Sequence, residues 1–111
     1  MILVGIGGTI GAILRYLVSR LRPIQGVPAG TLAVNIVGSF ALSAIASLNP
    51  GDAAYALLCT GVLGGFTTFS TFGFETFRML EDKDYYTALA NILLNIGGSL
   101  LGVYLGYRII V

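Results

Sequence analysis

The chain has 111 residues, enough for one domain, and 56% of them are hydrophobic while only 10% are charged. A typical soluble domain carries about 25% charged residues, so this composition indicates a membrane protein. The net charge of +1 gives no sign of a nucleic-acid partner. The lack of histidine excludes His-based catalysis and imidazole metal sites, and a single cysteine, Cys59, excludes an intrachain disulfide.

Four apolar stretches follow one another along the chain, separated by charged or turn residues. They cover residues 2–18, 28–48, 53–80 and 85–108, and crossing the hydrocarbon of a bilayer takes about 20 helical residues. Short loops place consecutive helices antiparallel, so both termini are expected on one side of the membrane. The sequence therefore predicts an all-α membrane protein with four transmembrane helices in a single domain, residues 1–111.

The first stretch holds a glycine repeat and a deep charge. Its "GIGGTIG" has the wrong spacing for a dinucleotide-binding G-x-G-x-x-G, and no strand is expected before it. Gly7 and Gly11 are four residues apart, which suits close packing against another helix. Arg15 lies inside the span, where an ionisable residue is by default a candidate functional group, although snorkelling from a helix end also explains it.

Polar residues four apart mark one face of the second stretch, because this spacing aligns side chains along a helix. They are Asn35, Ser39, Ser43 and Ser47. Single polar residues bind helices together in lipid, at about 0.6 kcal/mol each. An asparagine amide brings more donors and acceptors than lipid can satisfy, which favours a path lined by water or ions.

The third stretch contains "GGFTTFSTFGFET", in which hydroxyl groups and phenyl rings alternate after two glycines. Glycine lowers helix propensity, and hydroxyls compete for backbone hydrogen bonds, so a helix break is expected around Gly64–Thr71. Such a break frees carbonyls that can hold a cation and presents a helix N-terminus that favours an anion. Phe69 and Phe72 would share a face once the helix resumes, where ring edges could meet an anion or the rings could simply pack.

The fourth stretch repeats both patterns. Asn91, Asn95 and Ser99 form a second polar stripe, which strengthens the case for a water- or ion-lined path. A second run of small residues predicts a groove for close helix packing, at Gly98, Gly102 and Gly106.

Basic residues are unevenly divided between the two predicted sides of the membrane. The first and third loops with their flanks hold Arg15, Arg20, Arg22, Arg78 and Lys83. The other side holds Arg108 alone. The positive-inside rule then places those two loops in the cytoplasm and both termini outside.

These motifs together resemble one known family. "GGFTTFSTFGFET" resembles the signature of the Fluc (CrcB) family of fluoride channels, and "GGTIGAILRY" and "GTLAVNIVGSF" resemble its first two helix motifs. "ALANILLNIGGSLLG" fits its fourth helix, so the resemblance covers essentially the whole chain. It implies a fluoride-selective channel in the cytoplasmic (inner) membrane. It also implies an antiparallel, dual-topology homodimer with the third helix broken at its centre, and two pores that each draw residues from both subunits.

The resemblance also assigns roles to residues of this chain. Phe69 and Phe72 match the family's phenylalanine box, whose ring edges face fluoride, and Asn35 matches a pore asparagine. The other pore residues implied by position are Ser70, Thr71, Asn91, Asn95, Ser99 and Arg15. The backbone carbonyls of Gly64 and Thr67 match positions that hold a structural Na⁺ at the dimer interface.

Two features keep alternatives open. An antiparallel homodimer needs one chain to insert both ways, which uneven loop charge opposes, so the alternative is a heterodimer with an oppositely oriented paralogue. A small proton-coupled multidrug exporter is also a four-helix chain of this length, and Glu75 would be its membrane-embedded carboxylate. Without histidine no nucleophile–base pair can be assembled, so an enzyme is not expected.

Overall fold

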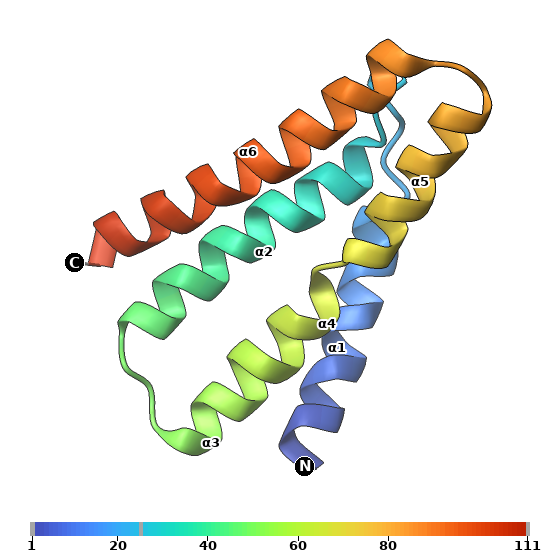
Figure 1. Ribbon diagram of the computed structural model, residues 1–111. Coiled ribbons are helices and arrows are strands. Elements are labelled where there is room, and N and C mark those ends of the chain that lie inside the picture. The colour runs from blue at the N-terminus through green and yellow to red at the C-terminus, as the bar shows by residue number, and fades with distance from the viewer. Residues whose placement is uncertain (1, 25, 111) are drawn as a thin grey trace.

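The computed structural model describes residues 2–24 and 26–110, and of Ser70 the backbone alone. The described residues form four helical passages that run up and down in turn (Figure 1). Their elements are α1 (Ile2–Val18), α2 (Ala29–Ser47), α3 (Asp52–Ala54), η1 (Tyr55–Leu63), α4 (Gly64–Phe66), α5 (Phe69–Glu81) and α6 (Tyr85–Ile110). The third passage thus consists of four elements, α3 to α5. Residues 19–24, 26–28 and 82–84 lie at one end of the molecule, and the described ends of the chain lie toward the other (Figure 1).

Helices α2 and α6 pack side by side along most of their length (Figure 1). The predicted glycine groove of α6 is filled by α2, because a Cβ on Gly102 would lie 2.9 Å from the carbonyl oxygen of Ile36. A Cβ on Gly106 would lie 2.5 Å from the carbonyl oxygen of Phe40. The glycines therefore serve packing within one chain, as close backbone approach requires.

Helix α1 packs against the first half of the third passage in the same way. A Cβ on Gly7 would lie 2.8 Å from the backbone nitrogen of Val62, and a Cβ on Gly11 would lie 2.8 Å from that of Phe66. The two pairs of helices are joined across the break, beyond which α5 packs on α6.

The third passage departs from a regular α-helix at two places. Residues Tyr55–Leu63 form a π-helix, a rare wide helix that the sequence pattern does not predict. The helix then stops after Phe66, and Thr67 and Thr68 are extended, with ψ of 153° and 117°. This break falls inside the predicted segment Gly64–Thr71. Thr68 caps the helix that follows, because its Oγ1 accepts a hydrogen bond of 3.2 Å from the backbone N–H of Thr71.

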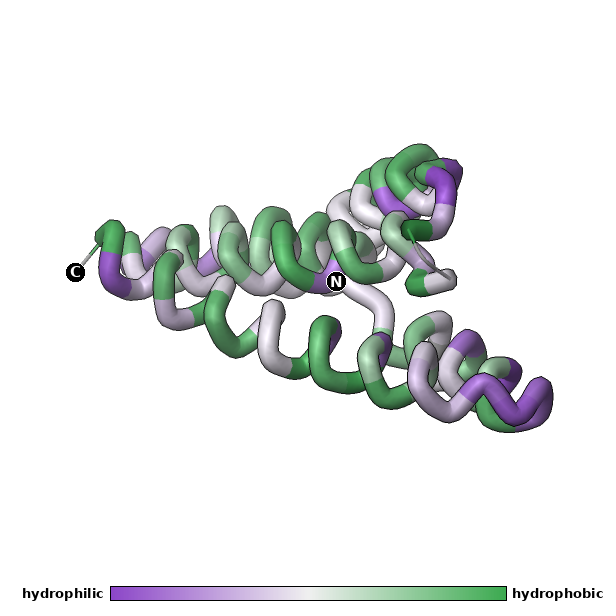
Figure 2. Tube along the Cα trace, turned by 90° about the horizontal axis from the view of Figure 1, so that it is seen from above, coloured by the Kyte–Doolittle hydropathy of each residue, from purple (hydrophilic) through white to green (hydrophobic). Residues whose placement is uncertain are grey.

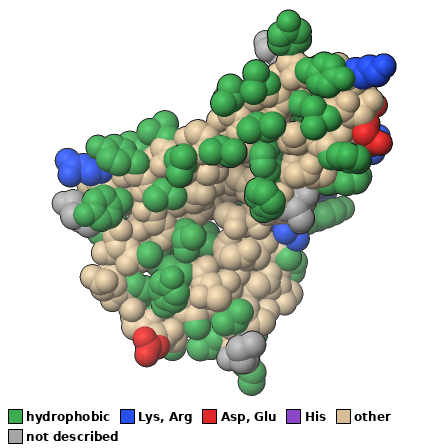
Figure 3. All heavy atoms as spheres, viewed as in Figure 1, with side chains coloured by type: hydrophobic (Ala, Val, Ile, Leu, Met, Phe, Trp, Pro, Cys, Tyr) green, Lys and Arg blue, Asp and Glu red, His purple; other side chains and the backbone are tan. Residues whose placement is uncertain are grey.

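Three passages are long and apolar enough to cross a membrane, namely α2, residues 52–81 and α6. Helix α1 is a shorter apolar helix of 17 residues, near the lower limit for a span. Figure 2 shows hydrophobic residues along the helices and hydrophilic residues gathered toward their ends. In Figure 3, hydrophobic side chains are spread over the whole visible face, and most charged side chains lie at its edges.

Candidate functional site

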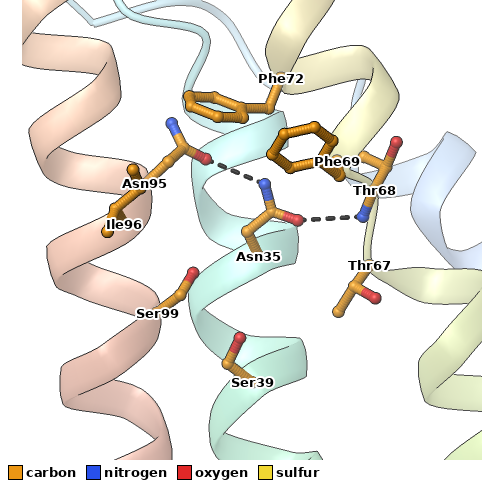
Figure 4. A pocket seen from close by; sticks show the side chains of 9 residues that line it. All are labelled: Asn35, Ser39, Thr67, Thr68, Phe69, Phe72, Asn95, Ile96 and Ser99. Carbon is orange, nitrogen blue, oxygen red and sulfur yellow. Dashed lines mark hydrogen bonds between the residues drawn. The ribbon is translucent and has the colours of Figure 1, made fainter.

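A cavity of about 260 Å³ opens where the helix break faces α2 and α6 (Figure 4). Its lining residues are Asn35, Ser39, Thr67, Thr68, Phe69, Phe72, Asn95, Ile96 and Ser99. We call this cavity the break pocket. Neither a Lys nor an Arg lines it, so its polar groups are uncharged amides, hydroxyls and backbone.

The Asn35 amide ties α2 to both sides of the break pocket. Its Oδ1 accepts a hydrogen bond of 3.0 Å from the backbone N–H of Thr68, and its Nδ2 donates one of 2.9 Å to Oδ1 of Asn95 (Figure 4). In an unbroken helix the Thr68 N–H would donate to the carbonyl of Gly64. Asn35 therefore satisfies a backbone donor that the break would otherwise leave unpaired.

The hydrogen bonds continue from Asn95 into the interior. Its Nδ2 donates to both the Oδ1 and the backbone carbonyl of Asn91, each at 2.9 Å. Asn91 Nδ2 donates to Oγ1 of Thr76 at 2.9 Å, and the Thr76 hydroxyl donates to the carbonyl of Phe72 at 2.9 Å. Asn91 is 0% exposed and lies behind the break pocket, outside its lining. Each amide oxygen and nitrogen of Asn91 and Asn95 thus has at least one partner, which makes a buried amide tolerable at membrane depth.

The two phenyl rings at the start of α5 meet edge to face. Their centroids are 5.7 Å apart and their planes are inclined by 64°. Phe72 is 8% exposed and lies against the amides, whereas Phe69 is 81% exposed at the mouth of the break pocket (Figure 4). One ring is therefore held by this chain, and the other is free to meet a neighbour.

The serines of the polar stripes have two different roles. Ser39 and Ser99 line the break pocket, and their hydroxyls form no hydrogen bond to other described residues. Ser43 donates a hydrogen bond of 2.6 Å to the carbonyl of Val103 and so joins α2 to α6. Helix packing thus explains Ser43 in the stripe on the second helix, and Ser39 of the same stripe lines the break pocket.

A second cavity of about 220 Å³ lies across the break from the first. Arg15 and Thr71 line it together with Thr31, and Thr68 lines both cavities. The predicted pore residues are therefore brought together in two groups that meet at Thr68, with Asn91 behind. The side chain of Ser70 lies outside the described part of the structure.

Gly64 and Thr67, the predicted Na⁺ ligands, flank the end of the first half-helix. Gly64 is exposed, and no backbone hydrogen bond joins α4 to α5 among the described residues. The carbonyl of Gly64 does not accept the Thr68 N–H, as it would in a regular helix, because that N–H donates to Asn35 Oδ1 instead. Such a carbonyl retains the capacity to hold a cation.

Comparison with known proteins gives the family. The model of the family described as "CrcB-like protein, Camphor Resistance (CrcB)" matches residues 2–107. The chain belongs to this CrcB family. It is 47% identical over 106 residues to "Fluoride-specific ion channel FluC 3" of Methanosarcina acetivorans, an alignment that covers 95% of this chain and 96% of that protein. It is 48% identical over 113 residues to "Fluoride-specific ion channel FluC" of Methanococcus maripaludis, covering 96% and 91%.

This CrcB-family chain is a multi-pass membrane protein, since its family and its apolar helices agree. Two polar residues of the break pocket and of the hydrogen bonds behind it were not predicted from its sequence. Thr68 is both a lining residue and a helix cap, and a hydroxyl just before the resumed helix was the available signal. Thr76 gave no local signal, because its partner Asn91 lies on another helix.

Proposed function

We propose that this CrcB-family chain is a fluoride-selective channel that lets fluoride leave the cell passively across the cytoplasmic membrane. Its relatives are named fluoride-specific ion channels and align with nearly its full length. The observation that carries the proposal is the break pocket, where amide, hydroxyl and ring groups meet in a membrane-spanning chain without a fixed charge.

The chemistry of the break pocket suits a small, strongly hydrated anion. A narrow pore must replace the water around fluoride with donors, and binding must remain weak enough for the ion to leave. Asn35, Ser39 and Ser99 offer uncharged donors, and the edges of Phe69 and Phe72 offer weakly electropositive C–H groups. A lysine or arginine there would hold the anion too tightly, and Arg15 lies in the neighbouring cavity.

The channel is proposed to be an antiparallel homodimer with two pores. Phe69 at the pocket mouth and Gly64 at the break are both exposed in one chain, so a second copy can complete both sites. A heterodimer with an oppositely oriented paralogue is the alternative arrangement. In either case the two chains would share the lining of each pore.

A structural Na⁺ at the subunit boundary fits the groups that the break leaves free. The carbonyls of Gly64 and Thr67 would hold it, and a hard cation of this kind takes neutral carbonyl oxygens as ligands. When bound, the ion supplies positive charge that stabilises these carbonyls. Because one chain offers only two of them, the second copy would supply the rest.

Fluoride efflux from liposomes tests the proposed function. The wild type should release fluoride and retain chloride, whereas Phe69→Ile and Phe72→Ile should each slow fluoride release by at least about tenfold, because they remove a ring edge and keep apolar bulk. The matched control is Phe74→Ile, which changes an exposed ring on the same helix outside the break pocket. Equal fluxes of fluoride and chloride through the wild type would contradict the proposal.

The proton-coupled exporter makes a different prediction at Glu75. One carboxylate oxygen of Glu75, Oε1, is buried without a hydrogen-bond partner in the described part of the chain. An exporter would need this carboxylate to exchange protons for substrate. If the chain were an exporter, Glu75→Gln should abolish all transport, and substrate flux should change the pH of the medium. The channel requires no coupled proton movement, so fluoride release should leave the pH of a lightly buffered medium unchanged.

A further inference from the structure

The hydrogen bonds from Thr68 to Phe72 form one directed series, which we call the amide relay. It runs from the Thr68 N–H through Asn35, Asn95, Asn91 and Thr76 to the Phe72 carbonyl. A backbone N–H can only donate and a backbone carbonyl can only accept. Both ends therefore require the same direction of donation along the series, which fixes the orientation of all three amides between them.

The amide relay decides which amide hydrogens remain available to an ion. The Nδ2 of Asn95 has two acceptors for its two hydrogens, the Oδ1 and the backbone carbonyl of Asn91. Asn35 uses one N–H on Asn95 and has a second that bonds to no other described residue. Since Asn35 lines the break pocket, this second N–H is the amide donor left for an anion there.

We propose that Asn91, Asn95 and Thr76 are positioning residues that hold Asn35 in its donating orientation, and that they do not themselves bind the permeating ion. This inference rests on the proposed function and assigns the amide donor of the pore to Asn35. Asn91 is fully buried, and Asn95 lines the break pocket with its donors already committed. Thr76 fixes the inner end of the relay, because its hydroxyl hydrogen is committed to the Phe72 carbonyl and its oxygen can only accept.

Single-channel recording of Thr76 variants tests this positioning role. Thr76→Val keeps the shape and removes the acceptor for Asn91, so the unitary fluoride current should fall by about two- to tenfold, as for one lost orienting hydrogen bond. Thr76→Ser keeps the hydroxyl and should retain the wild-type current. A merely structural role would lower the number of active channels and leave the unitary current unchanged, which would overturn the proposal.

Thr9→Val is the matched control for this substitution. Thr9 makes the same type of bond as Thr76, from its hydroxyl to the carbonyl four residues earlier, at 2.8 Å on an exposed face of α1. Its removal should leave the unitary current at the wild-type value. An equal loss of current in both variants would attribute the effect to the helix bond and would overturn the relay.

The side-chain amides of the unsubstituted protein give a second test that does not depend on the folding of a variant. The chain has four asparagines, so ¹⁵N-asparagine labelling gives four side-chain amide signals, with Asn49 as the loop reference. Fluoride titration should shift the Asn35 signal alone, and the Asn91 and Asn95 signals should exchange slowly with deuterium. A shift of the Asn95 signal as large as that of Asn35 would contradict the proposal.

Failure of the relay is distinct from failure of the proposed function. If the wild type passes fluoride while Thr76→Val passes it with the same unitary current, the relay is wrong and the channel stands. If the wild type passes no fluoride, the channel itself is wrong.

Discussion

The side-chain amide of Asn35, on α2, both accepts and donates a hydrogen bond. Its oxygen accepts the backbone N–H that the break exposes, and its nitrogen donates to Asn95 and keeps one N–H for the break pocket. One side chain thus stabilises the irregular backbone and supplies a donor at the same place. A substitution that reverses the polarity of this side chain should affect both.

The substitution Asn35→Asp should abolish fluoride release. An ionised carboxylate can still accept from Thr68, but it cannot donate, faces the oxygen of Asn95 and repels an anion. Efflux from liposomes should fall by more than about tenfold, a barrier increase above about 1.4 kcal/mol. The same change at Asn49, in an exposed loop, is the control and should leave efflux unaltered. Wild-type efflux from Asn35→Asp would show that this amide is not a pore donor.

Spacing alone revealed some of these residues and not others. Asn35, Asn95 and Ser99 line the break pocket, and helical periodicity marked each of them as part of a polar face. The partners of an amide are set by which helices pack together, however. The bonds from Asn35 to Thr68 and to Asn95 span 33 and 60 residues of sequence, so no local pattern contains them.

Glycine faces decide which helices pair. The glycines of α6 meet the backbone of α2, and those of α1 meet the third passage, so that each helix pair approaches to backbone contact. In lipid, such close packing replaces the hydrophobic driving force that water would supply. The two paired layers then leave the break between them, facing the amides of α2 and α6.

Adding one methyl group to the α1 contact should destabilise the protein. A Cβ on Gly11 would overlap the carbonyl oxygen of Val62 and lie 2.8 Å from the nitrogen of Phe66, so Gly11→Ala should cost about 1–3 kcal/mol of stability. Gly5→Ala on the same helix meets nothing within 4 Å and should be neutral or slightly stabilising. Thermal unfolding in detergent measures both. Equal melting temperatures for the two variants would mean that this contact does not hold α1.

The cap at the break should matter to the second half of the third passage. Thr68 Oγ1 accepts from the N–H of Thr71 and donates to its hydroxyl, at 3.2 and 3.0 Å. Thr68→Val removes the cap and should cost about 1 kcal/mol, whereas Thr68→Ser retains it. Amide hydrogen exchange of residues 69–72 reports the loss directly, and protection there should fall in the valine variant. Undiminished protection would show that the start of α5 is held by its packing alone.

The elements themselves were largely predictable, and their irregularities only partly. The length of the apolar stretches and the turn residues between them predict helical spans at residues 2–18 and 85–108. The helices observed there are Ile2–Val18 and Tyr85–Ile110. Glycines and hydroxyls gave the break, which lies at Thr67 and Thr68. The π-helix of Tyr55–Leu63 could not be foreseen, because its residues also suit an ordinary helix and the wider winding has no residue signature of its own.

A single chain leaves its candidate site open. The Phe69 ring is exposed at the pocket mouth, and Gly64 is exposed on the other side of the break, in α4. Large apolar side chains are exposed on every passage, which lipid or a second subunit must cover. The protein is therefore proposed to function as a pair of chains. Uneven loop charge opposes insertion of one chain in both orientations, so the relative orientation of the two chains needs a direct test.

Labelling of introduced cysteines should distinguish a dual-topology homodimer from a single orientation. Gly51→Cys and Asp82→Cys lie in exposed loops at opposite ends of the third passage, and neither changes a Lys or Arg. In a Cys59→Ser background, an impermeant maleimide added to intact cells should label about half of each, if uneven loop charge is too weak to decide insertion. Leu93→Cys, on the exposed apolar face of α6, should stay unlabelled as the membrane-buried control. Full labelling of one loop and none of the other, in cells that still export fluoride, would instead require an oppositely oriented partner chain.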